Sequence, residues 1–110
     1  MTLAERWNGT KWAIQKTPNP ARAIESGLSG VSCTSASACT AVGDYGNSAG
    51  TDVTLVERWN GTKWAIQKTP NPVGAIESSL EGVSCTSARA CTAVGFSHRV
   101  RTLTLAERHS

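Results

Sequence analysis

The chain repeats itself almost completely. Residues 2–43 and 54–95 are identical at 36 of 42 positions, with an offset of 52 residues. A third copy begins at Thr104, where Leu105-Ala106-Glu107-Arg108 repeats the segment 3–6. Self-similarity at a fixed period is the signature of repeat architectures, in which neighbouring units stack to bury a shared core. The sequence therefore predicts one structural unit that is used twice and then begun again.

The repeat boundaries follow from this comparison. We expect a first repeat over residues 1–53, which starts at the third strand of a unit, a second repeat over residues 54–103, and a partial third repeat over residues 104–110. In the third copy, His109 stands where the first two copies have Trp7 and Trp59.

Four short strands are predicted within one unit. Residues 80–85 and 90–95 form the first and second strands, and residues 54–59 and 63–68 form the third and fourth. Asn60-Gly61 lies between the last two, and Asn-Gly between β-rich segments is the strongest short hairpin signal, typical of a type I′ turn. Thr69-Pro70-Asn71-Pro72 ends the sheet, because proline cannot donate to a strand ladder.

Four antiparallel strands repeated about every 50 residues are typical of a β-propeller blade. The sequence thus predicts an all-β fold made of propeller blades, with two repeats per chain. Propellers usually close with four to eight blades, so we expect a ring closed by oligomerisation, most simply a trimer with six blades. A β-sandwich of eight strands is the alternative, although it does not explain the near-identity of the two halves.

Composition limits the partners. Only 39% of the 110 residues are hydrophobic and 5% aromatic, which is little for a self-contained core and favours a homo-oligomer. The net charge of +3 forms no basic stripe that recurs with the repeat, so we expect no nucleic acid. No apolar segment approaches the roughly 20 residues that span a bilayer, so we expect no membrane insertion. The first residues do not read as a signal peptide, so we expect either a mature or excised piece or a chain that stays inside the cell.

The four cysteines are the most specific chemical signal in the sequence. Cys33 and Cys39, like Cys85 and Cys91, bracket five residues at the tip of the first hairpin of each unit. Facing residues of an antiparallel pair have Cβ atoms about 4.5–5.5 Å apart, which suits a disulfide. We expect these two bridges; free cysteines and a metal site are the alternatives, and both histidines lie outside the repeated pattern. Disulfides indicate an extracellular or secreted protein.

Two families carry similar motifs. The pattern GVSCTSA, CTAVG, ERWNGTKW and TPNP resembles a propeller-type tandem repeat of large, mostly secreted bacterial proteins, and this resemblance covers nearly the whole chain. A narrower similarity, over about 14 of 52 residues, is to two-repeat fucose-binding lectins that trimerise into six-bladed propellers. It implies sugar binding between blades, with Glu57, Trp59 and Trp64 around the turn. The Arg that binds sugar in that family has no clear counterpart here.

The tryptophans and their charged neighbours are the candidate site. An indole face can stack on a sugar ring while nearby charged groups bind its hydroxyls, in a pocket between blades. The alternative is that the tryptophans fill the core between blades, and that the glutamate and arginine each meet a partner on the neighbouring blade. The candidate ligand-binding residues are Glu5, Trp7, Trp12, Glu57, Arg58, Trp59 and Trp64.

These residues favour a multivalent, lectin-like carbohydrate-binding module; a structural or protein-interaction propeller without a small ligand is the alternative. We expect no enzyme, no catalytic residue, no metal and no cofactor, because the repeat lacks a histidine to activate a nucleophile and has no carboxylate pair at a selected spacing.

The partial third repeat creates a competition. In a ring, residues 104–108 and residues 2–7 of the next chain claim the same strand position beside residues 90–95. Only the N-terminal copy continues into a fourth strand. We expect the N-terminal copy to occupy this strand position, and the C-terminal copy to be displaced or disordered.

Overall fold

The computed structural model describes residues 1–7, 10–48, 50–72, 74–98 and 102–109. Every regular element in these residues is a β-strand, so the predicted all-β class is confirmed. None of the described residues belongs to a helix long and apolar enough to cross a membrane. The strands are β1 (Ala4–Trp7), β2 (Trp12–Gln15), β3 (Glu25–Ser35), β4 (Ala38–Gly46), β5 (Asp52–Trp59), β6 (Trp64–Gln67), β7 (Glu77–Ser87), β8 (Ala90–His98) and β9 (Thr102–His109).

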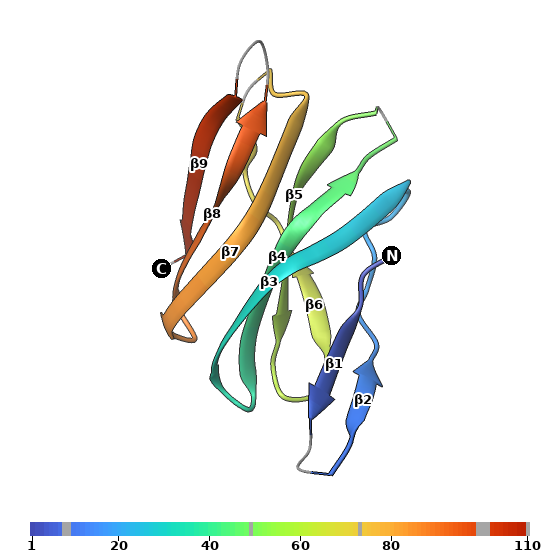
Figure 1. Cartoon of the computed structure of the whole chain (residues 1–110), viewed down its shortest axis with the longest axis vertical. Helices are drawn as coiled ribbons and strands as arrows, with labels where there is room; N and C mark the ends of the chain where they lie inside the picture. Colours follow the sequence, from blue (N-terminus) through green and yellow to red (C-terminus); the bar gives the residue numbers. More distant parts are fainter. Residues whose placement is uncertain (8–9, 49, 73, 99–101, 110) are drawn as a thin grey trace.

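The strands form three layers. The N-terminal hairpin consists of β1 and β2, the central layer is the antiparallel meander β3-β4-β5-β6, and the C-terminal layer is β7-β8-β9. Figure 1 shows the C-terminal layer on one side of the central layer and the N-terminal hairpin on the other. The central layer is therefore covered on two sides by parts of the same chain.

The sheets differ from the predicted set of separate four-stranded blades. A parallel pair, Asp52 with Glu77, joins β5 to β7 and links the two large layers into one mixed, sandwich-like sheet. Among the described residues, only the central layer contains all four strands of a unit. In the single chain, β9 pairs with β8 from Thr102 to His109. The expected displacement of the C-terminal copy concerns a ring of chains and stays a prediction.

The two large layers repeat the same register. Cys39 faces Trp59 across β4 and β5, and Cys91 faces His109 across β8 and β9. Each first hairpin also carries a register shift at the same place, after Leu28 and after Leu80. Near-identical sequence therefore builds the same pairing twice, as sequence-directed strand register requires.

The Asn-Gly hairpin is confirmed, but its turn type is not. The ladder closes at Trp59 and Trp64 across a four-residue loop, and of the two central residues only Gly61 has a positive φ, of 102°. The Asn60 side chain instead accepts hydrogen bonds from the backbone amides of Thr62 and Lys63 at 2.9 and 3.0 Å. This local capping is the alternative that asparagine offers in turns.

Both predicted disulfides are present. Cys33 is bonded to Cys39 and Cys85 to Cys91, each pair facing across the end of a hairpin with Cα atoms 4.0 Å apart. The bridges lock the hairpin tips, where the chain has few large side chains. Two disulfides are compatible with an extracellular protein.

The Thr-Pro-Asn-Pro segment does more than end a strand. Asn71 accepts a hydrogen bond from the backbone amide of Thr54 at 2.9 Å, and the hydroxyls of Thr54 and Thr69 lie 2.7 Å apart. The first repeat has the same contacts, with Asn19 2.8 Å from the amide of Thr2. The segment therefore fastens the end of the fourth strand to the start of the third.

Apolar side chains gather in two clusters, one on each face of the central layer. The first joins Val42 and Val56 to Leu80, Ala93 and Val83 of the C-terminal layer. The second includes Ala4 of the N-terminal hairpin. The second cluster contains Cys39, Ala41, Trp64, Ala4, Leu28 and Trp59.

Close approach of strands inside a layer also requires glycine: a Cβ on Gly43 would lie 1.9 Å from the carbonyl oxygen of Gly27.

Candidate functional site

Two arginines join one layer to the next in the same way. Arg6 on β1 donates from Nη2 to the carbonyl oxygen of Ala36 at 2.9 Å, at the tip of the β3–β4 hairpin. Arg58 on β5 donates to the carbonyl oxygen of Ala88, at the tip of the β7–β8 hairpin. The expectation that the arginines meet a neighbouring layer is confirmed for both. Arg58 is thereby a link between layers in this chain.

The tryptophans have different surroundings despite identical local sequence. Trp64 is 7% exposed and donates from Nε1 to Oε1 of Gln15 at 3.0 Å, whereas its counterpart Trp12 is 64% exposed. Trp59 is half-buried, donates to the Ala36 carbonyl at 3.1 Å, and lies under the Arg6 guanidinium at 5.3 Å from its ring centroid. That contact is a cation–π interaction. The predicted site residue Trp7 has a side chain outside the described part of the structure.

Glu57 is fully buried, in contrast to its exposed counterpart Glu5. It faces Ala41 and Ile66 across the strands, and neither carboxylate oxygen has a hydrogen-bond partner among the described residues. Desolvation by burial raises the pKa of Glu57 from 4.5 to about 7. The expectation that this glutamate binds a partner on the neighbouring layer is wrong for Glu57.

A second carboxyl group with a raised pKa is that of Asp44, near the end of β4 and opposite Thr54 of β5. Burial, and the nearby charge of Asp52, raise the pKa of Asp44, while a hydrogen bond with Ser79 acts in the opposite direction. Within the described ranges, no group of three or more histidine, cysteine, aspartate or glutamate side chains is arranged to hold a metal ion.

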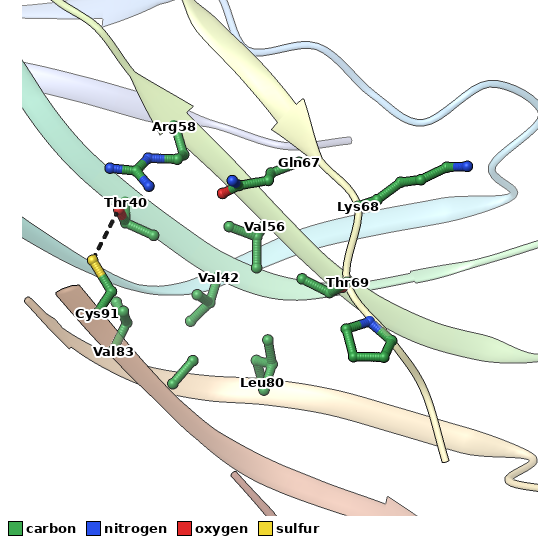
Figure 2. A pocket seen from close by; sticks show the side chains of 12 residues that line it. Thr40, Val42, Val56, Arg58, Gln67, Lys68, Thr69, Leu80, Val83 and Cys91 are labelled. Carbon is green, nitrogen blue, oxygen red and sulfur yellow. Dashed lines mark hydrogen bonds between the residues drawn. The ribbon is translucent and has the colours of Figure 1, made fainter. Parts of the chain in front are cut away.

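Three concave regions formed by described residues lie between the layers. The smallest is a cavity of about 110 Å³ between the central and C-terminal layers, shown in Figure 2, with Val42, Val56 and Leu80 among its lining. The second, here called the groove, has a volume of about 480 Å³ and lies between the N-terminal hairpin and the central layer. It is lined by Leu3, Ala4, Glu5, Arg6, Trp12, Gln15, Leu28, Ser29, Gly30, Val31, Cys33, Cys39, Ala41 and Trp64.

The third region, here called the hollow, has a volume of about 440 Å³ and lies where the segment after β2 faces the β5–β6 hairpin. The indoles of Trp59 and Trp64 meet there, with ring centroids 5.8 Å apart and planes inclined by 42°. The rest of the lining is Gln15, Lys16, Pro18, Thr62 and Lys63.

The structure therefore separates most of the predicted site residues. Trp59 lines the hollow, Glu5 and Trp12 line the groove, and Trp64 lines both. Glu57 lines none of the three regions. Arg58 lines the small cavity in Figure 2. Gln15, Lys16 and Lys63 were not among the predicted site residues, although Gln-Lys stands at the end of the fourth strand in both repeats and was a usable signal.

Comparison with known protein families, with curated proteins and with solved structures found no match to this chain.

Proposed function

We propose that the chain is a multivalent carbohydrate-binding module of propeller type, and that the hollow is its sugar site. The observation that carries this proposal is the pair of tryptophans at its wall, Trp59 and Trp64. Indole rings offer flat apolar surface to a sugar ring, and concave sites with a few convergent polar groups are the usual form of small-ligand sites. Gln15, Lys16 and Lys63 supply hydrogen-bonding groups for the hydroxyls.

Recurrence of the lining supports multivalency. Gln15, Lys16 and Pro18 recur in the second repeat as Gln67, Lys68 and Pro70, so the central layer carries one wall of a second hollow. The opposite wall requires the counterparts of Trp59 and Trp64, which are Trp7 and Trp12 of a neighbouring copy. Several weak sites on one particle raise the overall affinity without any new contact.

A propeller accounts for the stacking better than a two-layer sandwich. The central layer is a four-stranded antiparallel meander in chain order, and other layers pack on both of its faces. A propeller blade has neighbours on both sides, whereas a sandwich has only two layers. Three chains, each contributing two units, give a six-bladed ring on the outer surface of a cell or in its medium, where the disulfides persist.

The experiment is a glycan array followed by calorimetric titration of the best ligand. Lys63→Ala removes a charged group from the hollow and is expected to weaken binding at least tenfold. Arg89→Ala removes the same charge at the exposed β7–β8 turn and is expected to bind like the parent chain. Equal binding by both variants, or no glycan bound by the parent chain, would contradict the proposal.

A structural or protein-interaction propeller is the second candidate. It is favoured by the engagement of Arg58 and Trp64 in contacts between layers and by the burial of Glu57. A chain that assembles with native stability and gives no response to any glycan is the result that selects this role.

A further inference from the structure

The contact between the central and C-terminal layers shows how two units of this sequence pack. Val42 of β4 and Val56 of β5 lie against Leu80 and Ala93 of the C-terminal layer, beside the small cavity of Figure 2. Beside them, Oγ1 of Thr40 lies 3.6 Å from Sγ of Cys91, the contact drawn as a dashed line. Strand β4 is therefore the element that fills this interface.

The groove corresponds to this interface, but at the groove no described strand occupies the position that β4 has beside β5. Its lining residues Leu28, Val31 and Ala41 are the counterparts of Leu80, Val83 and Ala93 at an offset of 52 residues, and Ala4 is the counterpart of Val56. No described residue of the chain takes the place that Val42 has in the packed interface. As a result the groove has about 480 Å³ in place of about 110 Å³, and Val31 is 60% exposed.

The backbone beside the groove is also unpaired on one edge. In the central layer, β5 pairs with β4 on one edge and with β6 on the other. Its counterpart β1 pairs with β2, and no other described strand pairs with it. An open edge is a template for strand addition. The strand that corresponds to β4 is β8, whose Val94 is 52% exposed.

We infer that the groove and the open edge of β1 are the docking site for β8 of a second copy of this chain. Val94 of the incoming copy takes the place that Val42 fills within the chain, and its Thr92 lies beside Cys39 as Thr40 lies beside Cys91. The contact is heterologous, because one copy offers the groove and the other offers β8. The occupant fits because the chain already forms this interface once.

Strand β9 covers the β8 edge in the single chain and must leave when a second copy docks. Within the chain, Val94 faces Ala106 of β9 in the same way as Val42 faces Val56 of β5. Docking replaces Ala106 by Ala4 of the other copy, at the same register and with the same neighbouring sequence, Leu-Ala-Glu-Arg. One strand is thus exchanged for its own duplicate, so few contacts are lost, and the apolar groove is filled.

This inference rests on the proposed propeller-type stacking but not on the carbohydrate ligand. A chain that binds glycans as a monomer would overturn the docking of a second copy and leave the sugar site supported. A chain that assembles but binds no glycan would support the docking and overturn the sugar site. The residues that test it, Val94 and Val31, line neither the hollow nor its predicted recurrence.

The test compares three single variants by light scattering at matched concentration. Val94→Glu damages the incoming strand and Val31→Glu damages the groove, and both are expected to reduce the assembly to single chains with unchanged circular dichroism. Ile24→Glu places the same charge at another exposed residue, in the loop before β3, and is expected to assemble like the parent chain. A monomeric parent chain, or full assembly by Val94→Glu, would overturn the inference.

A mixture of the two damaged chains then tests the direction of the contact. The Val94→Glu chain keeps an intact groove and the Val31→Glu chain keeps an intact β8, so an equimolar mixture should form a two-chain species. A symmetric interface that contains both residues on each copy would show no such rescue. A mixture that remains monomeric would therefore contradict head-to-tail docking.

Discussion

Val94 is the counterpart of Val42 at an offset of 52 residues, yet Val42 is fully buried and Val94 is 52% exposed. Both valines lie on the second strand of a unit and both face a third strand at the same register. The difference is that the C-terminal layer packs over Val42, whereas no described part of the chain packs over Val94. One valine of the repeat is therefore buried within the chain, whereas its duplicate is exposed and can contact another copy.

The exchange of β9 for β1 predicts opposite results for the two terminal deletions. Removing residues 104–110 uncovers the β8 edge and should leave the assembly intact. Removing residues 1–12 deletes β1 and its continuation, and should leave single chains. Both are read by light scattering on the purified deletion variants. Dissociation by the C-terminal deletion would reverse the assignment of the exchanged strand.

The two disulfides should stabilise the chain separately and by similar amounts. Each joins cysteines with a sequence separation of 6, and closing so short a loop contributes about 2 kcal/mol by the chain-entropy relation. We expect Cys33→Ala with Cys39→Ala, and the matching double variant of the second pair, each to lower the free energy of unfolding in urea by about this amount. Peptide mapping without reduction should find no bridge between the two repeats.

Strands and disulfides were predictable because their signals are local. Alternating β-formers, the Asn60-Gly61 turn and the cysteine spacing each act within one hairpin, and the structure has strands and bridges at those places. The turn type was not predicted correctly, because the side chain of Asn60 caps the loop in place of a second positive φ.

Burial of the candidate site could not be predicted in this way. Trp12 and Trp64 lie in the same ten-residue context, Trp-Asn-Gly-Thr-Lys-Trp-Ala-Ile-Gln-Lys, yet one is 64% exposed and the other 7%. Glu5 and Glu57 are both followed by Arg-Trp-Asn-Gly, yet Glu5 is exposed and Glu57 is fully buried. Burial of these side chains depends on which layer packs over them, and that depends on the position of the repeat in the chain, which no local pattern contains.

The buried carboxyl of Glu57 predicts stability that falls as the pH rises. Its pKa is raised from 4.5 to about 7 by desolvation, so its contribution is fully present below about pH 4.5 and is lost as the pH rises through about 7. The shift corresponds to about 3 kcal/mol at most.

Urea unfolding at pH 5 and pH 8 measures this effect. Glu57→Gln should be more stable than the parent chain at pH 8 and should lose most of the pH dependence. The exposed counterpart variant Glu5→Gln should behave like the parent chain. An unchanged pH profile in Glu57→Gln would contradict the assignment.

The loop before β3 predicts a stabilising substitution. Arg22 has a φ of 62°, and its counterpart in the second repeat is Gly74, with a φ of 79°. A side chain in this left-handed region costs about 1 kcal/mol, partly offset by the greater freedom of glycine in the unfolded chain. Arg22→Gly should therefore raise the free energy of unfolding by about 0.5 kcal/mol, and the reverse change Gly74→Arg should lower it, both measured in urea.

Sedimentation equilibrium of the parent chain, which gives its molar mass in solution, shows whether copies of the chain associate. If the unfilled groove of one copy takes up β8 of the next, the mass is a multiple of the 11.6 kDa of one chain. A closed six-bladed ring gives three chains, independent of concentration over the micromolar range. A single folded chain at 11.6 kDa throughout that range would mean that the groove does not take up β8 of a second copy.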